Sequence, residues 1–108
     1  MKDTSNWSFD EVVEFLTLNG FIEIKVDSSH HIFKGVVNDI TTLVEVQYHA
    51  NVHGMIKPGT LRDGIIVQSR IPAAEWRKYA RMSTTMRKKY RYAGCLPLTA
   101  VAVKKQKR

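Results

Sequence analysis

The sequence predicts a small α+β domain in which one helix precedes a three-stranded antiparallel sheet and further helices follow it. Three observations support this fold class: a helix-start pattern near the N-terminus, alternating apolar residues between positions 22 and 48, and helical spacing after Pro58. The chain has 108 residues, of which 44% are hydrophobic, so its length suits one core rather than two. We expect a domain over residues 1–70, and a basic helix and tail over residues 71–108 that pack on it or extend it.

The first helix is expected over about residues 9–19. Ser8 and Glu11 have the spacing of a capping box, in which each side chain binds a backbone N–H group of the other residue. Gly20 is of the residue type that commonly follows a helix end. Beyond it, apolar and charged residues alternate over residues 22–26, which predicts a strand with one buried face.

Two further strands are expected after turns at residues 27–29 and 38–39. The stretch "HHIFKGVV" forms the second strand, and "TTLVEVQYHA" forms the third. In the third strand Val44, Val46 and Tyr48 share the apolar face, while the residues between them share the polar one. The three strands would form an antiparallel meander.

Two more helices are expected in the second half of the chain. Pro58 suits the first turn of a helix, and Gly64 within it costs about 1 kcal/mol relative to Ala, so this helix should be short or irregular. A longer helix should run from Pro72 to about Ala93, because aromatic and methionine residues recur there at intervals of three and four. These residues are Trp76, Tyr79, Met82, Met86 and Tyr90. The stretch from Cys95 onward is expected either to add an edge strand or to stay outside the fold.

The net charge of +7 is unevenly distributed along the chain. Residues 1–69 carry five Lys/Arg and nine Asp/Glu, whereas residues 70–108 carry twelve Lys/Arg and only Glu75. The C-terminal part should therefore attract polyanions, with RNA as the expected partner, although an acidic protein or an anionic membrane surface would also be attracted.

The sequence disfavours several functional classes. Cys95 is the only cysteine, which excludes an intrachain disulfide. The N-terminus lacks the pattern of a secretory signal, and no apolar run approaches the roughly 18 residues that span a bilayer, so we expect a cytoplasmic protein without a membrane partner. The stretch "GTLRDG" lacks the residues of a P-loop. His49 and His53 have a plausible ligand spacing, but without a cysteine pair or a second cluster we expect no metal and no other cofactor.

Three stretches within residues 9–62 follow one another in a distinctive order. They are "VVEFLTLNGF"; "SSHHIF", a strand start of the form Ser-His-x-x-aromatic; and "VEVQYHANVHGMIKPGTLRDGI", which contains the run Lys-Pro-Gly-Thr-Leu-Arg. Together they resemble the HicA-type toxins, a family of small mRNA interferases. Ser28 stands where the family has glycine, so the turn would need an unusual backbone angle from a non-glycine residue.

The resemblance implies a double-stranded-RNA-binding-domain-like fold of order α-β-β-β-α, followed here by the C-terminal helix. It also implies a metal-independent endoribonuclease that cleaves mRNA and is held inactive by an acidic HicB-type antitoxin. The family's catalytic histidine falls on His30. A histidine suits removal of the proton from a ribose 2′-OH, because its unperturbed pKa of about 6.5 leaves it largely neutral near pH 7.

His31 should project to the opposite face of the strand from His30. If Phe33 and Val37 face inward, His31 lies on their side and His30 is free for RNA, whereas a bulge would reverse this. His31 is therefore the alternative base. His49 matches a histidine near the end of the family's third strand, and the resemblance implies that it assists in proton transfer or positions phosphate. An ordinary surface or hydrogen-bonded role is the alternative for each histidine.

Basic residues should stabilise the charge on the cleaved phosphate and hold the RNA. Lys34 follows the site in the second strand, Lys57 and Arg62 lie at the start of the second helix, and further candidates lie in the C-terminal helix. These are Arg77, Lys78, Arg81, Arg87, Lys88, Lys89 and Arg91. The alternative for them is a solvated face, opposite an aromatic stripe that packs on the domain or across a homodimer.

Two other functions stay open from the sequence. One is a non-catalytic RNA-binding module on the same fold, with the basic extension supplying most of the affinity. The other is an oligomeric interaction protein whose C-terminal helix joins copies of the chain.

Overall fold

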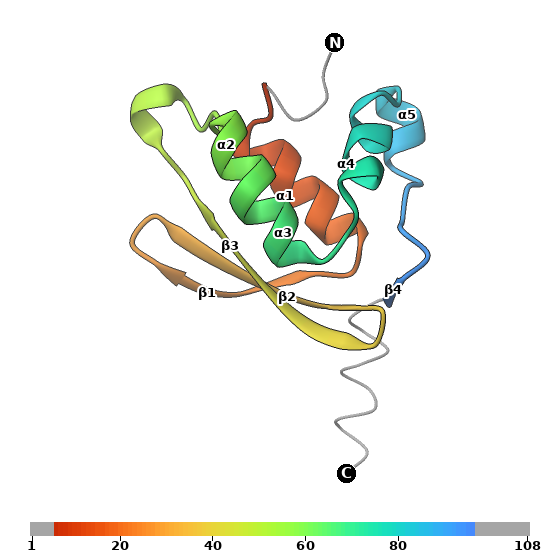
Figure 1. The fold of residues 1–108 in the computed structure, drawn as a ribbon. Coiled ribbons are helices and arrows are strands. Elements are labelled where there is room, and N and C mark those ends of the chain that lie inside the picture. Colours follow the sequence, from red (N-terminus) through yellow and green to blue (C-terminus); the bar gives the residue numbers. More distant parts are fainter. Residues whose placement is uncertain (1–5, 97–108) are drawn as a thin grey trace.

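The computed structural model describes residues 6–96 as an α+β fold, which confirms the expected fold class (Figure 1). The main part of its antiparallel sheet contains, in spatial order, β1 (Ile22–Asp27), β2 (His30–Val37) and β3 (Ile40–Gln47). One face of the sheet is covered by α1 (Phe9–Leu18), α2 (Pro58–Thr60) and α3 (Ile66–Ser69). Two further helices stand beside α1, namely α4 (Ala73–Ala80) and α5 (Thr84–Arg87).

The helix α1 begins and ends as expected. Oγ of Ser8 accepts a hydrogen bond from the N–H of Glu11 at 3.1 Å, and Oε1 of Glu11 accepts one from the N–H of Ser8 at 3.1 Å. The capping box therefore satisfies two backbone donors that the helix itself leaves unpaired. Gly20 follows the last turn with a φ of 86°, a left-handed conformation that glycine adopts without steric cost.

The register of the sheet places one face of β2 and β3 under the helices. Phe33 pairs with Val44, and His31 pairs with Val46. The side chains of Phe33, Val44 and Val46 are buried, so alternate residues of both strands lie on the open face. The expected alternation of β3 is confirmed for Val44 and Val46, whereas Tyr48 at its end is exposed.

The strand β1 is exposed along its whole length, which corrects the expectation of one buried face. Ile22, Ile24 and Val26 are 51%, 48% and 52% exposed. The pairing with β2 shifts between Glu23 and Lys25, and such a bulge interrupts the regular alternation of sides. In addition, β1 lies at the edge of the sheet and packs chiefly against β2 rather than under a helix.

The second helical segment is irregular, as its glycine predicted. Pro58 occupies the first turn of α2, and a π-helical turn over Leu61–Ile65, which contains Gly64, joins α2 to α3. Leu61 and Ile65 still bury their side chains in the core. The irregular turn therefore keeps the apolar side of the segment against the domain.

The single helix expected over residues 72–93 is replaced by α4 and α5. Arg81 ends α4, and Ser83 begins α5 by accepting a hydrogen bond from the N–H of Met86 at 3.3 Å. A serine hydroxyl competes with the helical backbone pattern and favours N-cap positions. Ser83 therefore interrupts the helix that the aromatic spacing predicted.

One core joins the two parts of the chain. Phe15 of α1 lies 4.1 Å from Trp76, 5.0 Å from Tyr79 and 5.5 Å from Tyr90, measured between ring centroids. All four rings are buried, and aromatic pairs of this kind add roughly 0.5–1.5 kcal/mol each beyond their area burial. The aromatic stripe of the C-terminal part is thus mainly core, although Met86 is exposed.

The described chain ends in β4 (Cys95–Leu96), which pairs with Val36 and Val37 of β2. This confirms the expected edge strand at these two residues. The rest of the expected tail, residues 97–108, lies outside the described residues. Among residues 6–96, no helix has both the length and the hydropathy that crossing a membrane requires.

Candidate active site

His30 and His31 lie on opposite faces of β2 and have different surroundings. Phe33 is buried beneath the helices, and His31 lies on the same side, where its ring meets the ring of Phe9 at 4.8 Å between centroids. Nδ1 of His31 is 2.6 Å from Oε2 of Glu23. The inward position of Phe33 therefore leaves His30 on the open face of the sheet.

His30 forms a hydrogen-bonded pair with Glu45 across β2 and β3. Its Nδ1–H donates to Oε2 of Glu45, and the two side chains are 43% and 49% exposed. With Nδ1 protonated, the neutral imidazole has its lone pair on Nε2. The carboxylate orients the ring and stabilises the positive charge that appears when Nε2 takes up a proton. The pair has the chemistry of a general base and its orienting group.

The turn before His30 has the unusual backbone angle that the resemblance implied for Ser28. Ser28 has a φ of 60°, a left-handed conformation that is unfavourable for a residue with a Cβ atom. Ser29 is hydrogen-bonded to the end of β3. The C=O of Ser29 accepts from the N–H of Tyr48 at 2.9 Å, and the Oγ of Ser29 accepts from Nε2 of Gln47 at 3.2 Å. These bonds position the start of β2, and with it the side chain of His30.

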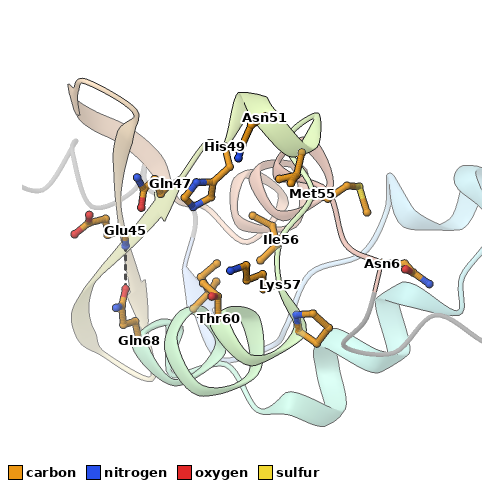
Figure 2. A pocket seen from close by; sticks show the side chains of 13 residues that line it. Asn6, Glu45, Gln47, His49, Asn51, Met55, Ile56, Lys57, Thr60 and Gln68 are labelled. Carbon is orange, nitrogen blue, oxygen red and sulfur yellow. Dashed lines mark hydrogen bonds between the residues drawn. The ribbon is translucent and has the colours of Figure 1, made fainter.

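A pocket of about 720 Å³ opens beside Glu45, between β3, the loop that follows it and the helical segment that begins at Pro58 (Figure 2). Glu45 connects this pocket to His30, because its carboxylate binds His30 while its backbone N–H donates to Oε1 of Gln68 at 3.0 Å. Besides Glu45, the polar residues that line the pocket are Asn6, Gln47, His49, Asn51, Lys57, Thr60 and Gln68. Its apolar lining residues are Val52, Met55, Ile56, Pro58 and Ile65.

His49 and Lys57 both line this pocket, although they are eight positions apart in the sequence. His49 begins the loop after β3, and Lys57 immediately precedes the first turn of α2. Figure 2 shows both side chains between β3 and the helix α2. An imidazole and an ammonium group can each donate hydrogen bonds to phosphate oxygens, so the pocket is suited to an anionic ligand.

The remaining predicted cations lie outside this pocket. Lys34 follows His30 on the open face of β2. Arg62 is exposed on the helical segment and pairs with its neighbour Asp63, with 3.2 Å between Nε and Oδ1. In Figure 1, α4 and α5 lie on the other side of α1 from the loop after β3. These two helices and the residues next to them carry Arg77, Lys78, Arg81, Lys88, Lys89 and Arg91.

Arg87, one of the expected RNA-binding residues, makes its hydrogen bonds within the domain. Its Nε donates to the C=O of Tyr79 at 3.1 Å, and its Nη2 donates to the C=O of Ala80 at 2.9 Å. Its Nη1 donates to Oε2 of Glu11 at 3.3 Å. The side chain is only 17% exposed. The guanidinium group therefore ties the end of α4 to the start of α1.

Among residues 6–96, no three His, Cys, Asp or Glu side chains lie close enough together to bind one metal ion. His53, which the sequence paired with His49 by spacing, has a left-handed φ of 55° in the loop after β3.

Sequence reasoning missed Glu45, Gln47 and Gln68 as site residues. For the first two a signal existed, because the alternation of β3 put them on the polar face of that strand. Gln68 had none, since its amide reaches the edge of β3 only through the packing of α3 beside that strand.

No protein-family model, curated protein or solved structure matches the chain. The fold and the site themselves therefore carry the functional inference. The site combines an exposed imidazole–carboxylate pair with a pocket that holds a second imidazole and an ammonium group. This combination suits acid–base chemistry on an anionic substrate.

Proposed function

We propose that the chain is a HicA-like toxin endoribonuclease that cleaves mRNA without a metal ion. The observation that carries the proposal is the exposed His30–Glu45 pair on the open face of the sheet, beside a pocket that contains Lys57 and His49. A carboxylate-oriented imidazole supplies the base that such a reaction needs, and the neighbouring groups suit a phosphate. The net charge of +7 also favours RNA as the substrate class.

In the proposed reaction, Nε2 of His30 takes the proton from a ribose 2′-OH. The 2′ oxygen attacks the adjacent phosphorus, and the bond from phosphorus to the 5′ oxygen of the next nucleotide breaks. The leaving 5′ oxygen takes a proton from water, and His30 afterwards returns its proton to the solvent. Glu45 stabilises the imidazolium that forms in the first step. The products therefore carry 2′,3′-cyclic phosphate and 5′-hydroxyl ends.

Charge on the phosphate must also be stabilised while the new bond forms. We assign this role to Lys57 and His49 in the pocket and to Lys34 on the open face of β2. His31, half-buried beside Phe9, has a structural role in this proposal. Arg62 and the exposed cations of the C-terminal part would hold the RNA strand further from the reacting atoms.

Cleavage of single-stranded RNA in the presence of EDTA tests the proposal. We expect His30→Ala to lower the cleavage rate by about 100-fold or more, with little change in RNA affinity. His31→Ala removes the histidine of the opposite face and should retain cleavage, provided that thermal melting shows it to be folded. Equal cleavage by the wild type and His30→Ala would rule out the assigned base.

A non-catalytic RNA-binding module is the second candidate function. It is favoured by the exposed cations in α4 and next to α4 and α5, namely Lys78, Arg81, Lys88, Lys89 and Arg91. These helices lie on the other side of α1 from the loop after β3, and cations can bind phosphates without any catalysis. RNA binding at low salt without cleavage of any substrate would select this function. A lack of RNA affinity at low salt would favour an interaction protein instead.

The proposed toxin would be held inactive in the cytoplasm by an acidic HicB-type antitoxin. The exposed cations suit an acidic protein, and Ile22, Ile24 and Leu43 supply exposed aliphatic side chains on strands of the sheet. Apolar surface of this kind is typical of protein-binding sites. An acidic protein encoded next to this chain should therefore bind it and block RNA cleavage.

A further inference from the structure

Two glutamines at the pocket are each held in place by one end of the amide group. Oε1 of Gln68 accepts from the backbone N–H of Glu45 at 3.0 Å, and Nε2 of Gln47 donates to Oγ of Ser29 at 3.2 Å. Within residues 6–96, the other amide atom of each glutamine has no hydrogen-bond partner. The pocket is therefore bordered by an oriented donor, Nε2 of Gln68, and an oriented acceptor, Oε1 of Gln47.

These two groups suit the edge of a nucleobase. Every base presents hydrogen-bond donors and acceptors side by side, and proteins that recognise single-stranded RNA bind those edges after the base has left the stack. Val52, Ile56 and Ile65 supply apolar contacts for the face of the ring. The pocket volume of about 720 Å³ lies within the range of roughly 300–1,000 Å³ that is typical of small-ligand sites. A nucleotide therefore fits both the size and the chemistry of the pocket.

We propose that this pocket binds one unpaired nucleobase of the RNA and thereby selects the nucleotide at which the strand is cut. The inference rests on the proposed endoribonuclease function. Glu45 connects the two parts of the site, because the residue that orients His30 also holds Gln68 through its backbone N–H. A base in the pocket places its own sugar and phosphate next to the His30–Glu45 pair, with Lys57 and His49, which line the pocket, beside the phosphate.

An extended peptide fits this place less well. Peptides that add to the edge of a sheet need free backbone N–H groups along the outer strand, and Gln68 already occupies the N–H of Glu45 at the edge of β3. The side chains of Lys57 and His49 suit a phosphate better than an uncharged backbone. A nucleotide uses the amide groups and the cationic groups together.

Titration of the full-length protein with the four nucleoside 3′-monophosphates tests the pocket separately from cleavage. In NMR spectra of the ¹⁵N-labelled protein, we expect shifts of the side-chain amide signals of Gln47 and Gln68 and of the backbone signal of Thr60. One nucleotide should bind at least about tenfold more tightly than the others. Ribose 5-phosphate has a phosphate but no base and should bind at least about tenfold more weakly than that nucleotide. Shifts confined to residues outside the pocket, or equal binding of ribose 5-phosphate, would overturn the proposal.

Two variants and one matched control locate the binding. Gln68→Glu keeps an oxygen that accepts from the N–H of Glu45 but replaces the free donor by an acceptor. It should therefore lower the affinity for the preferred nucleotide by about tenfold. Thr60→Trp should fill the pocket and abolish the shifts, whereas Thr85→Trp, which puts the same side chain on the exposed surface of α5, should leave them unchanged. If Thr60→Trp does not fold, the nucleotide affinity of Gln68→Glu alone tests whether the pocket binds the base. Unchanged affinity in folded Gln68→Glu shows that the pocket does not bind the base.

RNA cleavage by the same variants separates this proposal from the proposed function. The wild type should cut next to the nucleotide that binds best, and Gln68→Glu should lose that preference while it still cuts. If the protein cleaves RNA without base preference and Gln68→Glu changes nothing, the base-pocket proposal is wrong, whereas the endoribonuclease proposal is supported. Nucleotide binding in the pocket by a protein that cuts no RNA supports the pocket and overturns the endoribonuclease.

Discussion

His30 donates a hydrogen bond to Glu45 on the face of the sheet that the helices leave open. In the register of the sheet His30 pairs with Gln47, so Glu45 is its diagonal neighbour on β3. Diagonal neighbours in antiparallel sheets lie about 7–8 Å apart, a span that an imidazole and a carboxylate can bridge. The pair therefore depends on the register, because a slip of one residue would turn one of the two side chains to the other face.

Glu45→Gln should lower the proposed RNA cleavage by about tenfold or more and leave RNA binding nearly unchanged. The amide still accepts a hydrogen bond from His30, but it lacks the negative charge that stabilises the imidazolium. Initial cleavage rates on a fluorescent oligonucleotide measure the effect. Glu23→Gln changes the partner of His31 on the opposite face and is the matched control. A greater loss of cleavage rate with Glu23→Gln than with Glu45→Gln would show that His31, and not His30, is the base.

Ser28→Gly should raise the free energy of unfolding by about 0.5 kcal/mol. The φ of 60° at Ser28 costs a residue with a Cβ atom about 1 kcal/mol, and the greater freedom of glycine in the unfolded chain offsets only part of this gain. Urea unfolding followed by tryptophan fluorescence measures the change. Ser28→Val should lower the stability, because a β-branched residue tolerates this backbone angle poorly. A glycine variant less stable than the wild type would show that the turn is not strained.

Arg87→Ala should lower the free energy of unfolding by about 2–3 kcal/mol, since it removes the hydrogen bonds that the guanidinium group gives to Oε2 of Glu11 and to the C=O groups of Tyr79 and Ala80. Lys89→Ala removes an exposed cation from the same part of the chain and should change the stability by about 0.5 kcal/mol or less. Thermal and urea unfolding of both variants provide the comparison. If Arg87→Ala were as stable as Lys89→Ala and instead bound RNA more weakly, the structural role of Arg87 would be wrong.

Stability should decline at alkaline pH through three buried acids. Burial raises the pKa of Cys95 from 9.0 to about 11, and the pKa values of Tyr79 and Tyr90 are raised by burial and by hydrogen bonds to Glu14 and Glu75. Each group holds its proton more tightly in the folded chain than in the unfolded chain. The stabilisation is therefore fully present below about pH 9 and is lost as the pH rises through the folded-state values.

Urea unfolding at intervals from about pH 7 to pH 11 measures this decline. Cys95→Ala should remove the part of the decline that begins near pH 9, while the part due to the tyrosines remains. A free energy of unfolding that stays constant across this range would contradict the raised pKa values.

Local features of the fold could be predicted from the sequence because each depends on residues a few positions apart. The capping box joins Ser8 to Glu11, and the irregular second helix contains Gly64. The backbone angle of Ser28 has no such local signal, since it is expected only from the resemblance, in which glycine occupies that position. The same local reasoning failed where two local signals compete. Ser83 favours a helix start, yet it lies within an aromatic spacing that predicts one continuous helix, and only the packed structure shows that the serine prevails.

Other features depend on residues far apart and left no local signal. Arg87 reaches Glu11 across 76 positions, and Gln68 reaches Glu45 across 23. The exposed apolar residues of β1 follow from a bulge and from the position of that strand in the sheet. Such contacts form only when the core brings the elements together.

By itself, the sequence determined the α+β class, the order of the elements through the second helical segment, and the placement of His30 and His31 on opposite faces of one strand. These follow from periodicity and capping, which are local properties of the chain. Only the tertiary structure decided which of the two histidines is open. The helices cover the side of Phe33 and His31, and the pairing of β2 with β3 brings Glu45 and its pocket to His30.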